Sequence, residues 1–273
     1  MAIAATRHEP SRAVPPEAYF VGSAIFHYLG PAFAVLLFVR VAPLGVAWLR
    51  ILTAAAIFAM WRRPWHALRD PVVLAWGVVL AAMNCCFYTA IDRLPLATVA
   101  AIEFLPVIAL AALGARTRRN AAALALAVPG VYVLTGVHLE GEATGLAFAF
   151  ANAVLFAAYI VCADRAAKDG LGIDGLAAAM LLAALLVTPV GGTSVDAIAI
   201  AAGIGVGISS SVIPYVFDQL ALERLPRATY SLMVSILPAT ATVIGLVVLA
   251  QVPTLSDVGG IALVVSGVAL HRP

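Results

Sequence analysis

Four polar side chains interrupt long apolar stretches of this sequence, and they are the residues best placed to do chemistry. Arg50, Asn84, Glu103 and Asn152 each stand within an apolar run of the length that crosses a membrane. At about 1.5 Å rise per residue, we expect all four to lie roughly 10–12 Å below the outer membrane surface. A charged side chain inside the hydrocarbon costs roughly 2.5–3.5 kcal/mol on insertion scales and usually faces a cavity or a partner. The shared depth therefore predicts one hydrated pocket.

Glu103 is the strongest candidate for coupling chemistry. Removal from water favours the neutral form of a carboxyl, whereas a neighbouring cation favours its charged form. A carboxyl in that balance can exchange a proton as its exposure changes. The alternative is structural, with Glu103 paired to Arg50 or hydrogen-bonded between helices. Intramembrane ionisable groups are functional by default, which favours a role in transport.

Arg50 has two interpretations between which the sequence does not choose. Its guanidinium can bind a substrate carboxylate through two parallel hydrogen bonds, or it can neutralise Glu103. Asn84 and Tyr88 stand four residues apart and therefore share one face of a helix. That face either lines a cavity or hydrogen-bonds to a neighbouring helix.

A short motif occurs twice in the chain. Arg93–Thr98 reads RLPLAT, Arg224–Thr229 reads RLPRAT, and a proline follows each copy at a similar distance, Pro106 and Pro238. An odd number of membrane spans between the copies inverts the second half relative to the first. Inverted repeats with interrupted helices are typical of secondary transporters, which bind substrate between the halves.

The repeat aligns Tyr215 with the helix face that carries Asn84 and Tyr88, so we add Tyr215 to the candidate pocket. Pro214 stands beside it and follows three serines, Ser209–Ser211, which predicts a helix that bends easily. Proline removes a backbone donor inside a helix. We predict helix breaks at three prolines: Pro106, Pro214 and Pro238.

Composition supports a membrane protein without a soluble domain. Apolar residues make up 63% of the chain and charged residues 11%, with a mean hydropathy of +1.04, whereas soluble domains carry about 25% charged residues. We predict an all-α polytopic membrane protein with ten transmembrane helices in an inverted five-plus-five repeat. Residues 1–17 form a cytoplasmic tail, 18–137 the first half and 144–273 the second half. The predicted spans are 18–39, 43–61, 72–91, 96–114, 121–137, 144–163, 175–191, 197–221, 228–249 and 255–270.

The placement of basic residues predicts the orientation. With the N-terminus inside, the outer loops hold only Arg40 and Arg93, so we expect both termini in the cytoplasm. The basic clusters are short and juxtamembrane, which argues against nucleic-acid binding. The three cysteines and five histidines show no metal-ligand spacing, so we expect reduced thiols, no metal and no cofactor. Dispersed histidines also argue against a membrane-embedded enzyme.

Several segments resemble EamA-type proteins of the drug/metabolite transporter superfamily. Residues 44–53 (LGVAWLRILT) resemble the arginine-bearing second helix, and Ala101–Pro106 (AIEFLP) looks closest to the threonine/homoserine exporter branch. Ala157–Ile160, which contains Tyr159, and Leu225–Thr229 are similar to the same branch. The resemblance implies ten helices, Arg50, Asn84 and Glu103 as pocket residues, and export of small metabolites against a proton gradient. Two family glutamates are replaced here, by Leu237 and Gln251, and a frequent tryptophan is replaced by Phe156.

These observations favour a bacterial inner-membrane exporter of small metabolites, such as threonine or homoserine, that works by alternating access with proton antiport. Its expected partners are a small-molecule substrate, membrane lipid and protons, and a homodimer is left open. The candidate substrate-binding or coupling residues are Glu103, Arg50, Asn84, Tyr88, Asn152, Tyr159 and Tyr215. The alternatives are broad-specificity efflux of apolar compounds and a transporter-like fold without transport activity.

Overall fold

The computed structural model describes residues 14–114, 117–138, 142–191, 196–222 and 236–270, and within these ranges the chain is helical apart from short turns. Six helices or helical segments are long and apolar enough to cross a membrane. They are α1 (Pro16–Leu37), α2 (Pro43–Arg62), α3 (Pro71–Ile91), α6 (Ala143–Lys168), α7 (Gly172–Gly191) and the segment Ala197–Phe217. The remaining helices are α4 (Leu96–Gly114), α5 (Arg118–His138), α11 (Leu237–Leu249) and α12 (Leu255–Leu270). The all-α membrane fold is thus confirmed, whereas the number of ten spans stays a prediction.

Local sequence explains where several helices begin. Proline occupies the first position of α1, α2 and α3, where its missing N–H costs no helical hydrogen bond. Asp70 caps α3 by accepting from the backbone N–H of Val72 at 2.8 Å and of Val73 at 3.2 Å. Asp196 caps α8 (Ala197–Gly207) in the same way, through the N–H of Ala199 at 2.6 Å. These caps satisfy backbone donors that the first helical turn leaves without partners.

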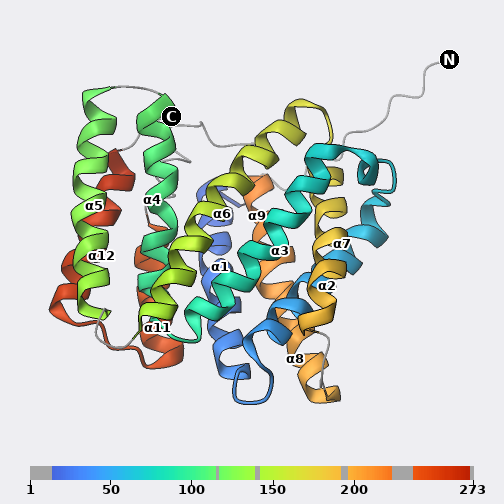
Figure 1. The fold of residues 1–273 in the computed structure, drawn as a ribbon, viewed down its shortest axis with the longest axis horizontal. Helices are drawn as coiled ribbons and strands as arrows, with labels where there is room; N and C mark the ends of the chain where they lie inside the picture. Colours follow the sequence, from blue (N-terminus) through green and yellow to red (C-terminus); the bar gives the residue numbers. More distant parts are fainter. Residues whose placement is uncertain (1–13, 115–116, 139–141, 192–195, 223–235, 271–273) are drawn as a thin grey trace.

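The helices form two groups joined by a central set (Figure 1). Helices α4, α5, α11 and α12 lie on the left of Figure 1, and α2, α3, α7 and α8 lie on the right, with α1, α6 and α9 (Ile213–Leu222) between them. The most extensive packing joins α5 to α12, α3 to α6, and α2 to α7. Each of these pairs brings together a helix from the first half of the sequence and one from the second. The two halves are therefore intertwined rather than separate.

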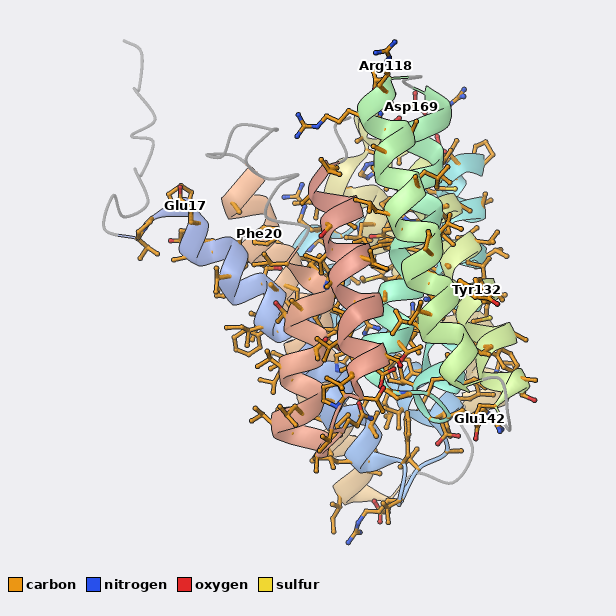
Figure 2. All side chains as sticks on the ribbon, turned by 90° about the vertical axis from the view of Figure 1, so that its left-hand side faces the viewer. Glu17, Phe20, Arg118, Tyr132, Glu142 and Asp169 are labelled. Carbon is orange, nitrogen blue, oxygen red and sulfur yellow. The ribbon has the colours of Figure 1, made fainter. Side chains whose placement is uncertain are left out.

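Apolar side chains cover the outer flanks of the bundle. Tyr132 on α5 points away from it in Figure 2 and is 75% exposed, and Leu185 and Val247 are similarly exposed on α7 and α11. Large apolar side chains exposed along helix flanks fit a lipid environment, because lipid tails are as apolar as the side chains themselves. Three charged residues labelled in Figure 2 lie instead at helix ends, with Arg118 and Asp169 at one end of the bundle and Glu142 at the other.

A π-helical segment, η2 (Ile208–Val212), interrupts the long helix between α8 and α9. It packs against α1 and α2. Small residues permit this approach, since a Cβ on Gly30 would lie 2.3 Å from Ser210 Cβ and one on Gly207 would lie 2.6 Å from Thr53 Cβ. The sequence predicted a bend here, and a π segment is one of the recognised ways in which a helix departs from regular geometry.

The three predicted helix breaks differ in their surroundings. Pro214 is the second residue of α9, directly after η2, and Pro238 lies in the first turn of α11. Pro106 lies inside α4, which is assigned as one helix on both sides of it. The first copy of the repeated motif joins α3 to α4, whereas the second copy, Arg224–Thr229, lies outside the described residues, as does most of the predicted tail.

Candidate functional site

Arg50 on α2 donates hydrogen bonds to three acceptors from two other elements. Its Nη1 lies 2.8 Å from Asn84 Oδ1 on α3, its Nε lies 3.0 Å from Ser211 Oγ, and its Nη2 lies 3.2 Å from the Ser210 carbonyl oxygen. Both serines belong to η2. A guanidinium is always charged, yet all three of these acceptors are neutral. With the residues that the structure describes, Arg50 forms no ion pair within 4.0 Å.

The orientation of the Asn84 amide follows from its second contact. Asn84 Nδ2 donates to the Leu80 carbonyl oxygen at 2.9 Å, which leaves Oδ1 to accept from Arg50. One turn further along α3, the buried Tyr88 ring lies 5.7 Å from Arg50 Cζ, measured to the ring centroid. At this distance the cation and the ring attract each other. Asn84 and Tyr88 thus share the predicted face, and both contact the guanidinium.

Glu103 on α4 and Asn152 on α6 form a second polar contact. Asn152 Nδ2 donates to Glu103 Oε1 at 3.2 Å, and both side chains are buried. Asn152 Oδ1 is also buried and has no hydrogen-bond partner among the described residues. In this conformation Glu103 and Arg50 are not an ion pair. The four residues predicted at one depth therefore contact each other as two separate pairs.

Aromatic rings extend from the Glu103–Asn152 pair to the Arg50 cluster. Tyr159 and Tyr215 place their hydroxyl oxygens 3.2 Å apart, bridging α6 and α9. Phe156 stacks on Tyr159 with ring centroids 6.1 Å apart, and Phe104, next to Glu103, contacts Phe156 edge-on. The two predicted tyrosines are thus brought together, from segments 56 residues apart in the chain.

A small pocket opens beside the Arg50 cluster. It holds about 20 Å³, room for little more than one water molecule. Its polar lining comes from Arg50, Asn84, Ser211 and Tyr215, and its apolar lining from Ile51, Ala54, Leu80, Met83 and Met180. Glu103, Asn152, Tyr88 and Tyr159 do not line it. An amino acid requires a wider opening than this conformation provides.

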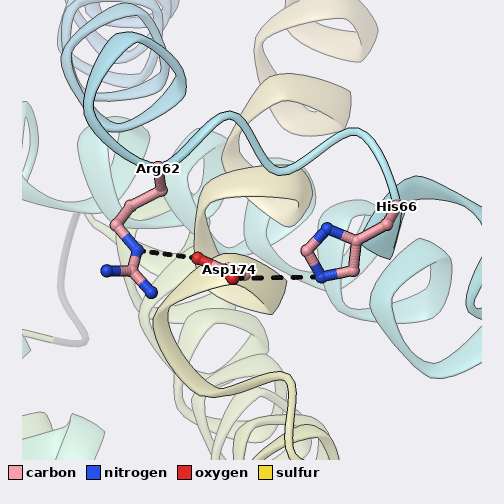
Figure 3. Close-up of polar contacts among 3 residues, drawn as sticks. All are labelled: Arg62, His66 and Asp174. Atoms are coloured by element: carbon pink, nitrogen blue, oxygen red, sulfur yellow. Dashed lines mark hydrogen bonds and ion pairs between the residues drawn. The ribbon is translucent and has the colours of Figure 1, made fainter. Parts of the chain in front are cut away.

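Sequence reasoning missed the backbone contribution of Ser210. The serine triplet next to Pro214 predicted a bend in the helix. The hydrogen bond from Arg50 to the Ser210 carbonyl depends instead on the backbone geometry of η2, which the sequence does not show. Reasoning from sequence also gave no sign of a polar cluster at one helix end, which is separate from the site. There, Arg62 Nε lies 2.7 Å from Asp174 Oδ1, and His66 Nε2 lies 3.9 Å from Asp174 Oδ2 (Figure 3).

The long apolar helices define this protein as a multi-pass integral membrane protein. The model of the EamA-like transporter family matches residues 143–271. The threonine/homoserine exporter RhtA of Escherichia coli (strain K12) is 32% identical over 238 residues, which are 82% of this chain and 80% of that protein. RhtA of Salmonella typhimurium (strain LT2) is 30% identical, and the alignment again covers 82% of this chain and 80% of that protein. The chain belongs to the EamA-like transporter family, which confirms the resemblance noted in its sequence.

A crystal structure of another protein has the same fold. It aligns with 94% of this chain and 96% of its own, with a TM-score of 0.63 and 21% sequence identity. At that identity the likeness concerns the fold alone.

Proposed function

We propose that this protein exports small amino acids, with threonine and homoserine as the first candidates, across a bacterial inner membrane by proton antiport. The observation that carries the proposal is the half-buried guanidinium of Arg50, which contacts first-half and second-half residues together and has only neutral acceptors among the described residues. The RhtA relatives are threonine/homoserine exporters, which supports the choice of substrates.

Alternating access of two inverted halves, residues 18–137 and 144–273, is part of the proposal. Helix packing supports it through matched contacts. The packing of α3 on α7 has a counterpart in α8 on α2, and the packing of α4 on α6 has a counterpart in α11 on α1. When each helix is replaced by its counterpart in the other half, the α3–α7 contact becomes the α8–α2 contact, and the α4–α6 contact becomes the α11–α1 contact. A repeat of five helices requires this correspondence. Residues 1–17 and both chain ends are cytoplasmic in this proposal.

Substrate recognition follows from the charges of a zwitterion. Its carboxylate needs a cation and its ammonium group needs an anion or several acceptors. Arg50 supplies two parallel donors, Nε and Nη2, when it exchanges the Ser211 hydroxyl and the Ser210 carbonyl for a carboxylate. Glu103 supplies the acidic partner for the ammonium group. Opening of the pocket between η2 and α3 would bring both groups to one substrate.

Proton coupling is assigned to Glu103. Asn152 can partner both forms of that carboxyl, because an amide has a donor for the carboxylate and an acceptor for the protonated acid. The buried Asn152 Oδ1, which has no partner among the described residues, supports this role. We assign protonation of Glu103 to the outward-open state and release of the proton to the inward-open state.

Flux in proteoliposomes with an imposed pH gradient tests the proposal. Wild-type protein should move threonine or homoserine faster with the gradient than without it. Glu103→Gln should abolish that acceleration while the protein stays folded. Asp164→Asn is the matched control, because Asp164 is exposed and pairs only with Lys168 one turn away among the described residues. Gradient-driven flux that survives in Glu103→Gln would show that Glu103 is not the coupling residue.

Efflux of apolar compounds is the second candidate, and the apolar part of the pocket lining favours it. Flux of hydrophobic dyes without amino-acid flux would select it. Absence of all flux from folded protein would instead support a fold that has lost transport.

Gln251, which replaces a family glutamate, accepts a hydrogen bond from the Leu96 N–H at 3.1 Å, so its present contact is structural.

A further inference from the structure

Two packed groups of helices lie on either side of the Arg50 pocket. In one group α3 packs extensively against α6, and in the other α1 packs along α8, η2 and α9. Between the groups, the described parts of α6 and α9 do not pack extensively on each other, and neither do α1 and α3. Arg50 joins the groups, since it donates to Asn84 of α3 and to Ser211 of η2. A passage to Arg50 from either end of the bundle therefore has to run between these groups.

A pair of tyrosines bridges the space between α6 and α9. Tyr159 Oη and Tyr215 Oη lie 3.2 Å apart. The Tyr159 ring lies 5.6 Å from the Trp76 ring on α3, measured between centroids. The Tyr215 ring lies 6.3 Å from the Phe58 ring on α2, and Tyr215 also lines the pocket beside Arg50. The hydroxyl contact therefore stands where the pocket ends on this side.

Aromatic rings also bridge the space between α1 and α3. The Phe38 ring, directly after the last residue of α1, lies 6.3 Å from the buried Tyr88 ring in an edge-on arrangement. At about 1.5 Å rise per residue, Tyr88 stands about 6 Å beyond Asn84, and Tyr215 stands about 6 Å beyond Ser211. Because α3 and α9 run in opposite directions (Figure 1), the two ring contacts lie toward opposite ends of the bundle.

The two contacts are counterparts in the proposed inverted repeat. Exchange of the halves replaces α1 by α6 and α3 by the segment from α8 to α9, so the space between α1 and α3 becomes the space between α6 and α9. We propose that the Tyr159–Tyr215 hydroxyl contact and the Phe38–Tyr88 ring contact are the two gates of the pocket, and that each opens while the other stays closed. This inference rests on the alternating access proposed above, in which the halves rock about a fixed site.

Thiol accessibility tests the gates without a transport assay. The parent has its three cysteines replaced and carries Ala54→Cys, because Ala54 lines the pocket and is fully buried. A membrane-impermeant thiosulfonate reagent is added to right-side-out and to inside-out vesicles. Tyr215→Phe keeps the ring and removes the hydroxyl contact, so labelling from the side where α6 ends should accelerate about two- to tenfold. Labelling from the other side should not accelerate.

Phe38→Ala should give the opposite asymmetry. It removes the ring contact with Tyr88, so labelling should accelerate about two- to tenfold from the side where α6 begins and from that side alone. Tyr132→Phe and Phe33→Ala are the matched controls, because Tyr132 points away from the bundle (Figure 2) and Phe33 is 44% exposed. Both controls should be labelled at the rate of the parent.

The proposal is overturned if neither gate variant changes the labelling rate, if either accelerates labelling equally from both sides, or if both act from the same side. Should Phe38→Ala fail to fold, Phe38→Leu takes its place, because it keeps an apolar side chain and loses the ring. The assay uses no substrate, so absence of amino-acid flux would count against the proposed function and leave the labelling result standing. Unchanged labelling in a protein that transports amino acids would overturn the gates alone.

Discussion

The chemistry of Arg50 depends on its neutral partners. Asn84, Ser210 and Ser211 hold the guanidinium in place but do not cancel its charge. A substrate carboxylate displaces neutral acceptors more easily than it would displace a carboxylate of the protein, because a neutral acceptor lacks the attraction between opposite charges. Two substitutions test this at the residue scale.

Arg50→Lys keeps the charge and removes the planar fork. A lysine ammonium cannot reproduce bidentate binding of a carboxylate, so the apparent affinity for amino acids should fall about tenfold or more. Export of amino alcohols, which lack the carboxylate, should change much less. Competition assays in proteoliposomes measure both. Arg40→Lys is the control, because Arg40 is exposed and lies 3.7 Å from Asp196 at a helix end. Equal loss for both substrate types would indicate a structural role for Arg50.

Asn84→Asp provides Arg50 with a permanent carboxylate at the position of an acceptor now 2.8 Å away. The new carboxylate should compete with the substrate, so amino-acid flux should fall at least about tenfold, while the thermal unfolding temperature should not decrease. Asn84→Ala removes one neutral acceptor and adds no charge beside the guanidinium, so its flux should exceed that of Asn84→Asp. Wild-type flux in Asn84→Asp would rule out carboxylate recognition by Arg50.

At the scale of elements, η2 connects packing to the site. Its Ser210 carbonyl and Ser211 hydroxyl accept from Arg50, and α1 packs closely against the same segment at Gly30. Gly30→Ala places a Cβ 2.3 Å from Ser210 Cβ and 2.7 Å from Ser210 Cα, so the segment must shift. We expect a loss of about 1–3 kcal/mol in the free energy of unfolding, together with reduced flux.

Gly205→Ala is the matched control for that substitution. Gly205 lies in α8, and a Cβ there meets no atom within 4 Å. Alanine is the better helix former by up to about 1 kcal/mol, so Gly205→Ala should be neutral or stabilising. Denaturant unfolding in detergent micelles measures both variants. Equal stability of the two would mean that α1 and η2 tolerate more space between them than their contact indicates.

At the scale of the whole molecule, the predicted orientation places opposite ends of the bundle on opposite sides of the membrane. Glu142 lies at one end and Asp169 at the other (Figure 2). In a chain whose three cysteines are replaced, Glu142→Cys should react with a membrane-impermeant maleimide added to intact cells, and Asp169→Cys should react only after permeabilisation. The opposite pattern would reverse the orientation, and labelling of both from outside would contradict the predicted number of intervening spans.

Much of the architecture follows from sequence because its causes are local. Apolar runs, prolines at helix starts and caps such as Asp70 depend on neighbouring residues, so the extents of α2 and α3 nearly match the predicted spans. The common depth of Arg50, Asn84, Glu103 and Asn152 stays a prediction from the rise per helical residue.

Tertiary structure alone decided which of those four side chains meet. Rotation of each helix about its axis depends on packing against distant segments, and no local rule sets it. Packing pairs Arg50 with Asn84 and Glu103 with Asn152, and it adds the Ser210 carbonyl, whose availability depends on the π-helical turn of η2. The amino-acid sequence by itself thus determined the family and the all-helical membrane fold. The contacts among the polar groups required the folded bundle, because they join residues that are 34 to 160 positions apart in the chain.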